Sequence, residues 1–231
     1  MVKLGEYKKA IDLLEKIVRC LHDGLDSSKG VCLCLNELNI KEEKDIFEHF
    51  PSLKADLDED LKFFVQSDPA IVSDEEVIYA YPGYKAITCY RIAHLLDDLG
   101  YHLYARIIAE EAHSKTGIDI HPSAKISVPF FIDHGTGIVI GETTIIGQRV
   151  KMYQGVTLGA ISVSNAPSLK GVKRHPTVGD DVIIYANATI LGNIKIGDDC
   201  IIGSNTYIRE DIPPHTIVKN PKPELILNVR K

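Results

Sequence analysis

Acidic, basic and imidazole side chains gather at three points in the second half of the chain. These points are Asp119-Ile-His121-Pro, Asp133-His134-Gly-Thr-Gly and Arg174-His175-Pro. A carboxylate that orients an imidazole and stabilises its positive charge helps it act as a general base, a role worth about 10²–10⁴ in rate. If the fold stacks successive turns of the chain, the spacing of Asp119 and His134 places them on neighbouring turns. It therefore favours His134 as a base with Asp119 as its partner.

Each of these groups also has a purely structural interpretation. A histidine in a turn of a stacked coil can hydrogen-bond the next turn, which would account for His121 and His134 singly. Arg174 and His175 can anchor a loop through ion pairs. Asp68, which precedes a proline, can simply end a helix. The residue types and their spacing leave these alternatives open.

An aliphatic residue at every sixth position organises the same half of the chain. One series is Ile120, Ile126, Ile132, Ile138, Thr144, Val150 and Val156, and the other is Val178, Ile184, Ile190, Ile196, Ile202 and Ile208. A period of six is neither helical nor simply alternating, and it predicts a parallel β-helix of hexapeptides. Three hexapeptides, about 18 residues, form one triangular turn, and turns stack at about 4.8 Å. The repeated aliphatic side chains then fill a shared interior.

The first half of the chain has the pattern of helices. Apolar residues recur at three- and four-residue steps, at Ile11, Leu14, Val18, Leu21 and Leu25 and again at Leu53, Leu57 and Leu61. Pro51, Ser67-Asp68-Pro69 and Pro82-Gly83 are expected to break the region into separate helices. A capping box at Ser73 marks one helix start. Two further helices are expected over 84–99 and 102–115.

The two patterns divide the chain into a helical domain over 1–117, a β-helix over 118–215 and a tail over 216–231. The step from Val156 to Val178, which joins the two series, is not a multiple of six. The small and polar composition of this stretch predicts a loop over 159–173 that protrudes from the coil. Long loops in compact solenoids commonly carry function.

Composition and charge narrow the class of protein. The 231 residues are 45% hydrophobic, with a net charge of −6 and a pI of about 5.8. No basic run is long enough to follow a phosphate backbone, so nucleic-acid binding is not expected. No apolar run is long enough to cross a membrane, and a cytoplasmic location is expected. The five cysteines are expected to be reduced thiols, including Cys32 and Cys34, and no metal site is predicted.

Five blocks of sequence together resemble serine O-acetyltransferase, a hexapeptide-repeat acyltransferase. They are Gly117-Ile-Asp-Ile-His-Pro122, Ile132-Asp-His-Gly-Thr-Gly-Ile-Val-Ile-Gly-Glu142, Gln154-Gly-Val-Thr-Leu-Gly159, Arg174-His-Pro176 and Ile190-Leu-Gly-Asn-Ile194. In the helical half, Ser67-Asp-Pro-Ala70 and Tyr90-Arg-Ile-Ala-His94 are also similar to that family. The resemblance implies an α+β fold in which an all-helical N-terminal domain precedes a left-handed parallel β-helix with one protruding loop.

The resemblance implies the reaction and the roles of the candidate residues. The acetyl group of acetyl-CoA is transferred to the hydroxyl of L-serine, giving O-acetyl-L-serine and CoA in the first step of cysteine biosynthesis. His134 would be the general base, assisted by Asp119. Serine would bind to Asp68, Asp133, Arg174 and His175, so that the helical domain contributes part of the serine site.

Acetyl-CoA would be a co-substrate, with no permanently bound cofactor. The positions that match its contacts are Thr157, Leu158, Gly159, Ala160 and Ala186, and Lys170 and Lys173 could meet its phosphates. Ala160, Tyr185 and Asn187 stand where the family commonly has glycine, and the loop over 159–173 is longer than in well-known members. We therefore expect the acetyl-CoA edge to be shaped differently here.

The resemblance also implies an assembly: a homotrimer with active sites between subunits, which the helices join as a dimer of trimers. The chain ends Asn228-Val-Arg-Lys231 without the terminal isoleucine that docks into O-acetylserine sulfhydrylase in many members, so that complex is not expected. Two other functions stay open. One is an acetyltransferase of the same architecture that acts on another hydroxyl acceptor. The other is a zinc hydratase like the γ-type carbonic anhydrases, which would use His121, His134 and His175.

Overall fold

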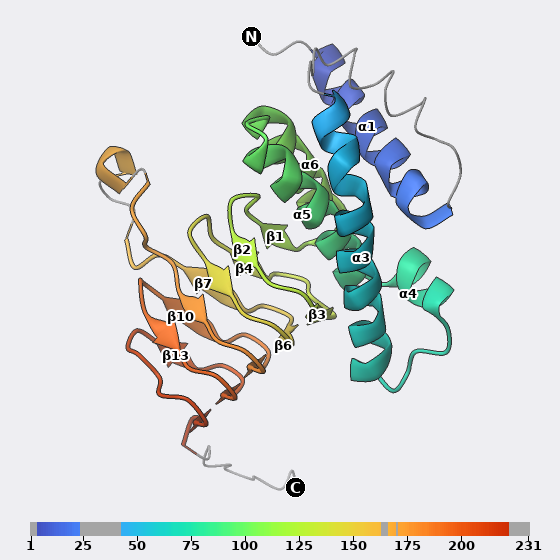
Figure 1. The fold of residues 1–231 in the computed structure, drawn as a ribbon. Coiled ribbons are helices and arrows are strands. Elements are labelled where there is room, and N and C mark those ends of the chain that lie inside the picture. Colours follow the sequence, from blue (N-terminus) through green and yellow to red (C-terminus); the bar gives the residue numbers. More distant parts are fainter. Residues whose placement is uncertain (1–3, 24–42, 163–165, 170, 222–231) are drawn as a thin grey trace, which may run out of the picture.

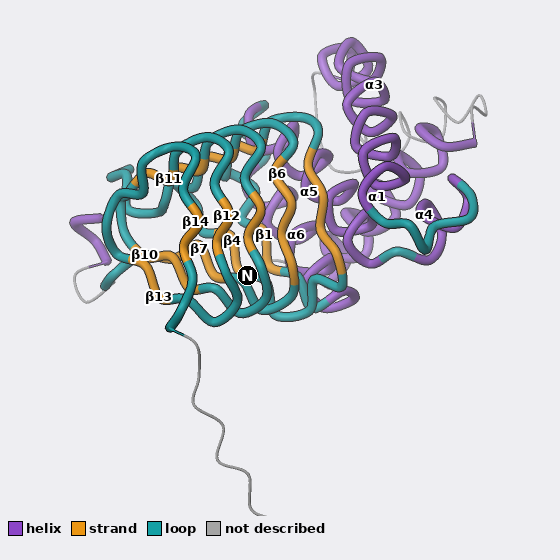
Figure 2. Tube along the Cα trace, turned by 90° about the horizontal axis from the view of Figure 1, so that it is seen from below, coloured by secondary structure: helices purple, strands orange, loops and turns teal. Residues whose placement is uncertain are grey.

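Helices stand at one end of a three-sided parallel β-solenoid (Figure 1). The structure, a computed structural model, describes residues 4–23, 43–162, 166–169 and 171–221. Seen from below, the rungs of the solenoid lie side by side along its axis, beside the helices (Figure 2). The architecture is the predicted α+β arrangement of helices followed by a left-handed parallel β-helix.

Five helices are described before the solenoid begins. They are α1 (Leu4–Asp23), α3 (Glu43–Ser67), α4 (Asp74–Ala80), α5 (Pro82–Asp98) and α6 (His102–Thr116). Ser73 caps α4 by accepting a hydrogen bond from the Glu76 amide, as expected. Pro82 occupies the first turn of α5, where its missing N–H costs nothing. Gly117 ends α6 in the left-handed conformation, with a φ of 71°.

The prediction that Pro51 breaks a helix was wrong. Pro51 lies inside α3, which continues to Ser67. A proline removes one backbone hydrogen bond, but Ile46, Leu53 and Leu57 on the two sides of it are all buried in the helical core. Burying this apolar stripe outweighs the local cost, because tertiary packing supplies most of the stability of a helix in a protein.

The strands form three parallel sheets, one for each face of the solenoid. The first sheet has the order β1-β4-β7-β10-β13, the second β11-β8-β5-β2 and the third β14-β12-β9-β6-β3. The strands are β1 (Asp119–Ile120), β2 (Lys125–Ile126), β3 (Phe130–Asp133), β4 (Val139–Ile140), β5 (Ile145–Ile146), β6 (Val150–Tyr153), β7 (Thr157–Gly159), β8 (Thr177–Val178), β9 (Ile183–Ile184), β10 (Thr189–Leu191), β11 (Lys195–Ile196), β12 (Ile201–Ile202), β13 (Tyr207–Ile208) and β14 (Ile217–Val218). All thirteen residues of the two hexapeptide series are buried.

The register of the strands differs from a strict period of six at one corner. Ile120 pairs with Ile140 on the next rung, and Ile140 pairs with Leu158 on the rung after that. The first of these turns is longer than the second by two residues. Ile138 and Val156 are buried, but they precede the paired positions by two residues.

The predicted loop leaves the solenoid after β7 and returns before β8. Leu158 pairs with Ile190 on the next rung, so the turn between them, which contains the loop, is far longer than the others. The loop protrudes from the coil and carries a short 3-10 helix, η1 (Ala166–Leu169) (Figure 1).

A buried ion pair fastens the helices to the first turn of the solenoid. Arg91 of α5 donates to both oxygens of Asp60 of α3, at 2.9 and 3.1 Å. Asp60 also accepts from the Phe130 amide at 2.8 Å, and Arg91 donates to the Ile126 carbonyl at 2.6 Å. At Gly83 the first turn of α5 rests on the backbone of β3, where a Cβ atom would lie 2.1 Å from the Ile132 carbonyl oxygen.

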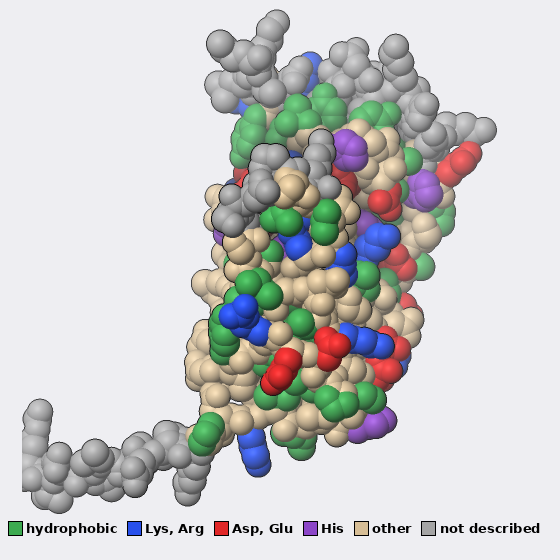
Figure 3. Space-filling model, turned by 90° about the vertical axis from the view of Figure 1, so that its left-hand side faces the viewer, with side chains coloured by type: hydrophobic (Ala, Val, Ile, Leu, Met, Phe, Trp, Pro, Cys, Tyr) green, Lys and Arg blue, Asp and Glu red, His purple; other side chains and the backbone are tan. Residues whose placement is uncertain are grey.

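The surface carries charges of both signs. On the face shown in Figure 3, Lys/Arg and Asp/Glu side chains are interspersed over the solenoid. Among the described residues, no helix is both long and apolar enough to span a membrane.

Candidate active site

His134 lies at the corner where the chain leaves β3 and enters β4. Five residues separate the paired positions Asp133 and Val139, whereas three separate Tyr153 and Thr157 on the next rung. The two extra residues of the first turn are therefore placed at this corner. The His134 side chain is 73% exposed, with its Nε2 3.8 Å from Oδ1 of Asp133. The insertion gives the imidazole room to reach a ligand outside the coil.

The backbone of His134 is left-handed, with a φ of 57°. This conformation is uncommon for a residue with a side chain. Six further non-glycine residues share it in the described part of the chain: Arg149, Asp181, Asn187, Asp199, Asn205 and His215. Each lies in a turn between strands. The conformation therefore belongs to the solenoid corners and does not by itself mark a catalytic residue.

Asp68 approaches the same corner from the end of α3. Its Oδ1 accepts from the Ala70 amide at 2.8 Å, the contact expected of a residue that ends a helix. Its Oδ2 accepts from the Tyr81 hydroxyl at 2.9 Å. Burial, and then the carboxylate of Asp68, raise the pKa of Tyr81 to about 12, and Asp133 contributes in the same direction. Asp68 thus has both a structural role and an oxygen facing the candidate site.

Two stacked tyrosines lie on the rungs of the solenoid that follow the rung of Asp133. Asp133 pairs with Tyr153 in the register of the third sheet, and the rings of Tyr153 and Tyr185 stack with centroids 5.2 Å apart. Burial raises the pKa of Tyr153, and the charges of Asp133 and Asp68 add to this effect. The corner therefore combines two carboxylates with neutral phenols, an environment that suits a positively charged amino group.

Asp119 lies on β1, one rung above the strand that follows His134. Its amide donates to the Ile138 carbonyl at 2.9 Å, and its side chain is half-buried. In the part of the chain that the structure describes, no hydrogen bond or ion pair joins Asp119 to His134. Their placement on adjacent rungs follows the prediction, while their pairing stays a prediction.

Arg174 and His175 are held at the corner between the first and second sheets. The Nδ1 of His175 accepts from the Thr143 amide at 3.1 Å, and Thr143 Oγ1 accepts from the Arg174 amide at 2.9 Å. Arg174 also forms an ion pair with Glu142. The loop-anchor interpretation of these two residues therefore describes their contacts here.

His175 is neutral in this setting. Burial, followed by the charges of Arg174 and Lys173, lowers the pKa of His175 to about 4. Because Nδ1 accepts from an amide, the ring proton sits on Nε2 and is available as a donor. Lys173 donates to the carbonyls of His175 and Pro176, so its ammonium is engaged with the backbone. Lys170 lies outside the described residues.

The predicted serine-binding residues thus occupy two different edges of the first sheet. Asp68, Asp133 and His134 meet where β3 passes into β4, and Arg174 and His175 where β4 passes into β5. Between the two corners the chain follows β4 for about five residues, on the order of 15 Å. A single bound serine molecule is too small to contact both edges of the same chain.

The predicted acetyl-CoA positions divide in the same way. Thr157, Leu158 and Gly159 belong to β7, with Ala160 at the start of the loop. Leu158 is completely buried, so only its backbone could face a ligand. Ala186 lies at the other edge, next to Asn187, whose amide donates to the Gln154 carbonyl at 2.9 Å. Ala186 therefore shares an edge with His134, and Ala160 shares one with Arg174.

The three histidines of the hydratase alternative do not gather in one chain. The charges of His121 and Glu142 both act on His175, whereas His134 lies at the opposite edge of the first sheet. No group of three or more His, Cys, Asp or Glu within the described ranges could hold a metal ion. Cys32, Cys34 and residues 222–231 of the predicted tail lie outside these ranges.

The sequence did not indicate several neighbours of the site. They are Tyr81, Glu142, Thr143, Tyr153 and Tyr185 as a stacking partner. Tyr153 could have been found from the sequence. If the turn that contains His134 is taken to be two residues longer than the next turn, Tyr153 falls beside Asp133 on the neighbouring rung. No sequence pattern pointed to Tyr81, because the contact between the end of one helix and the start of another is not part of a repeat.

Known proteins resemble this chain over most of its length. A family described as bacterial transferase hexapeptide (six repeats) matches residues 175–210. The "Serine acetyltransferase, plasmid" of Synechococcus elongatus is 50% identical over 171 residues, which are 73% of this chain and 54% of that relative. The serine acetyltransferase of Helicobacter pylori is 44% identical over 175 residues, which are 76% of this chain and 99% of that relative.

Solved structures agree with these relatives. Serine acetyltransferase isoform 3 from Entamoeba histolytica, in complex with cysteine, has a TM-score of 0.81 and 35% identity over 94% of this chain and 84% of its own. The serine complex of the Neisseria gonorrhoeae serine acetyltransferase has a TM-score of 0.72 and 29% identity over 91% and 80% of the two chains. A serine acetyltransferase in complex with CoA has a TM-score of 0.66 and 34% identity over 75% and 71%.

Proposed function

The chain belongs to the serine acetyltransferase family, and we propose that it transfers the acetyl group of acetyl-CoA to the hydroxyl of L-serine at a site made by two copies of the chain. One observation carries the proposal: the candidate serine residues are divided between two edges of the first sheet. If three solenoids pack side by side, the His134 edge of one copy meets the Arg174 edge of the next. The homotrimer then has three equivalent clefts.

Serine fits such a cleft by charge. Its ammonium group is suited to Asp68 and Asp133 of one copy, whose edge carries two carboxylates beside neutral phenols. Its carboxylate is suited to Arg174 of the next copy, where the guanidinium already binds the carboxylate of Glu142. The Nε2–H of neutral His175 is a further donor at that edge.

The reaction needs one base and good positioning. His134 Nε2 removes the proton from the serine hydroxyl as the oxygen attacks the thioester carbonyl of acetyl-CoA. The new C–O bond forms, the C–S bond breaks, and the sulfur of CoA takes up the proton. Asp119 stabilises the imidazolium of His134. Catalytic hydrogen bonds are commonly long in a free enzyme and shorten when substrate binds.

Acetyl-CoA is expected along the groove between neighbouring solenoids. The outward-facing Thr157 and Gly159 lie on the face of the first sheet, with Ala160 at its Arg174 edge, and Ala186 of the neighbouring copy lies on the other side of the groove. Small residues let an extended pantetheine arm approach the backbone. The CoA complex of a related serine acetyltransferase supports this co-substrate.

The reaction is tested by thiol release from acetyl-CoA with L-serine, homoserine, threonine and sugars as acceptors. We expect release with serine that falls by orders of magnitude in His134→Ala. Thiol release only with another acceptor would instead identify an acetyltransferase of the same architecture that acts on a hydroxyl other than that of serine.

The shared site is tested by mixing two inactive variants. His134→Ala and Arg174→Ala are refolded separately and together, and trimers are isolated. In random mixed trimers about a quarter of the clefts combine an intact His134 with an intact Arg174 from the neighbour. Activity should therefore return on mixing. If each chain held a complete site, every cleft would lack one residue and no activity would return.

A further inference from the structure

The imidazole of His175 occupies the space in which a side chain at position 141 would lie. A Cβ atom on Gly141 would be 2.1 Å from Cδ2 of His175, 2.2 Å from its Nε2 and 2.8 Å from its Cγ. Carbon atoms that are not bonded to one another pack at about 3.5–4.0 Å. The imidazole and any side chain at position 141 therefore exclude each other.

This space lies on the outer face of the first sheet. Along β4, Val139 is exposed and Ile140 is buried. Side chains alternate along a strand, so position 141 faces outward like Val139. The Gly141 amide still belongs to the ladder of the sheet, because it donates to the Leu158 carbonyl at 3.1 Å. The imidazole of His175 is thus placed on the outer face of the sheet and not in the interior of the solenoid.

Thr143 fixes the opposite side of the ring. Its amide and its hydroxyl donate to Nδ1 of His175 at 3.1 and 2.9 Å. The hydroxyl oxygen also accepts from the backbone amide of His175 at 3.1 Å. The His175 side chain is buried. If the ring turned away from Gly141, it would lose these bonds to Nδ1 and part of its burial.

From this geometry we infer that Gly141 is a positioning residue for His175. Its missing side chain leaves the space that the imidazole fills, and this space and Thr143 together set the direction of Nε2–H. Gly159, beside Gly141 on the next rung, also lacks a side chain that could cover the ring. An effect of Gly141 on serine binding rests on the proposed function, in which Nε2–H is a donor to serine.

The surroundings of His175 indicate what a displaced ring would do. Burial is the main cause that lowers the pKa of His175 to about 4. Charged and titratable groups act on the ring from three segments: Arg174 and Lys173, which lower its pKa, Glu142, which raises it, and His121, which lowers it. A ring that leaves its place over Gly141 becomes more exposed, so its pKa should rise toward the ordinary value of 6.5.

Gly141→Ala tests the position of the ring directly. The full chain is labelled with carbon-13 at Cε1 of histidine and titrated by NMR, and the signal of His175 is identified by its absence from His175→Asn. We expect the pKa of His175 to rise by about one pH unit or more in Gly141→Ala, because the ring loses burial. This measurement does not depend on acetyl transfer, so it can fail while the proposed function stands.

A double variant shows whether alanine at position 141 acts through the ring. Gly141→Ala should lower the thermal midpoint of the wild type, and it should lower that of His175→Asn much less, because asparagine has no ring to displace. The KM for serine should rise about tenfold in Gly141→Ala, the effect of losing one hydrogen bond to a charged group. In the His175→Asn background, Gly141→Ala should raise this KM no further.

Gly147→Ala is the matched control on the same rung. Gly147 follows β5 as Gly141 follows β4, and a Cβ atom there would be 2.3 Å from Oδ1 of Asp180 and 2.7 Å from the carbonyl carbon of Gly179. This variant should cost at least as much stability as Gly141→Ala. It should leave the pKa of His175 and the KM for serine unchanged, because it does not touch the ring.

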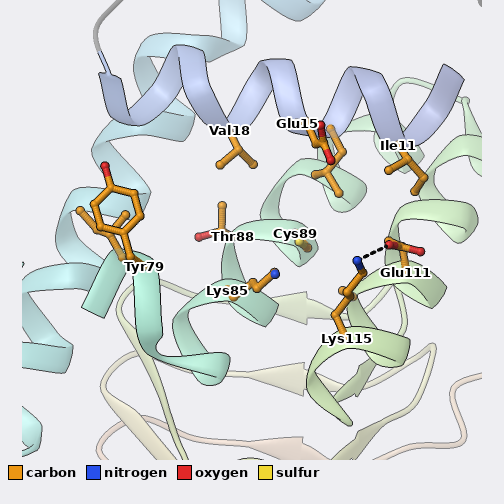
Figure 4. Close-up of a pocket in the computed structure, with 12 residues that line it drawn as sticks. Ile11, Glu15, Val18, Tyr79, Lys85, Thr88, Cys89, Glu111 and Lys115 are labelled. Carbon is orange, nitrogen blue, oxygen red and sulfur yellow. Dashed lines mark ion pairs between the residues drawn. The ribbon is translucent and has the colours of Figure 1, made fainter. Parts of the chain in front are cut away.

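Val18→Ala is a second control, placed in the helical part. Val18 projects from α1 into a groove of about 470 Å³ between α1 and α4, α5 and α6 (Figure 4). It is partly buried against the helical core, so its truncation lowers stability without contacting the strands. A rise in the KM for serine equal to that of Gly141→Ala would assign the effect to lost stability and overturn the inference.

Two further results would also contradict the inference. One is an unchanged pKa of His175 in Gly141→Ala, and the other is an equal loss of thermal stability from Gly141→Ala with and without the imidazole. A raised pKa with an unchanged KM for serine would support the positioning of His175 by Gly141. It would overturn the proposed contact between His175 and serine.

Discussion

The Tyr81 hydroxyl donates to Oδ2 of Asp68 across a gap of 2.9 Å, joining the end of α3 to the start of α5. The other oxygen of Asp68 accepts from the Ala70 amide. The carboxylate is thereby fixed at both oxygens before any substrate arrives. Preorganisation of this kind lowers the entropic cost of holding a ligand.

Tyr81→Phe should raise the KM for serine about tenfold, because a hydrogen bond to a charged group contributes about 1.5–3 kcal/mol. The KM for acetyl-CoA should change little. Initial rates with each substrate varied in turn measure both constants. Tyr79→Phe is the control, since Tyr79 is 76% exposed and its hydroxyl does not contact Asp68. An equal rise in both KM values would instead point to a general disturbance of the fold.

His134→Ala should lower kcat by about 10²–10⁴, the usual contribution of a general base. Asp119→Asn keeps the shape of its side chain and removes the charge, so it should lower kcat less while leaving the KM for serine nearly unchanged. Single-turnover measurements at saturating acetyl-CoA separate chemistry from product release. If Asp119→Asn mainly raised KM, Asp119 would bind substrate and would not assist the base.

The fold was predictable from the sequence because each rung repeats the same requirement. An interior position such as Ile126 must be apolar, and its equivalents Ile146, Val178 and Ile196 are stacked directly on it. The phase of the repeat was not predictable across the His134 corner. Both Ile138 and Ile140 are aliphatic and buried, so composition alone does not show which of them lies in the strand.

The site was predictable only in part. The family motifs pointed to His134, Asp133, Arg174 and His175, yet their division between two edges depends on the loop after β7 returning to the corner of Thr143. Pro51 is a case in which the local sequence was misleading. The proline predicts a helix break, but the burial of residues on both sides of Pro51 stabilises the helix by more than the proline costs.

Asp60→Asn should reduce the free energy of unfolding by about 3–5 kcal/mol, because it leaves the Arg91 charge buried without its partner. The two side chains are 0% and 6% exposed. Asp58→Asn is the matched control: Asp58 pairs with Lys54 at the surface of the same helix and should cost less than about 1 kcal/mol. Urea unfolding at fixed protein concentration gives both values. Equal effects of the two variants would show that the buried pair adds no special stability.

His175 should make the stability of the protein depend on pH in the acid range. Its pKa in the folded protein is about 4, below the ordinary value of 6.5, because burial and the charges of Arg174 and Lys173 disfavour the imidazolium. As pH falls, the unfolded chain therefore takes up the proton first, and acid favours unfolding. The stabilisation by the neutral ring is complete above about pH 6.5 and is lost progressively toward pH 4.

This dependence is isolated with His175→Asn, whose side-chain oxygen can replace Nδ1 as the acceptor for the Thr143 amide. Thermal midpoints of both proteins are measured from pH 8 to pH 4. The advantage of the wild type over the variant should be constant above pH 7 and shrink as the pH falls through 6 and 5. An advantage that stayed constant toward pH 4 would mean that folding leaves the pKa of His175 unchanged, against the burial argument. An advantage that grew toward pH 4 would mean that the folded protein stabilises the imidazolium, through Glu142, and His175 would then not be the neutral donor proposed for serine.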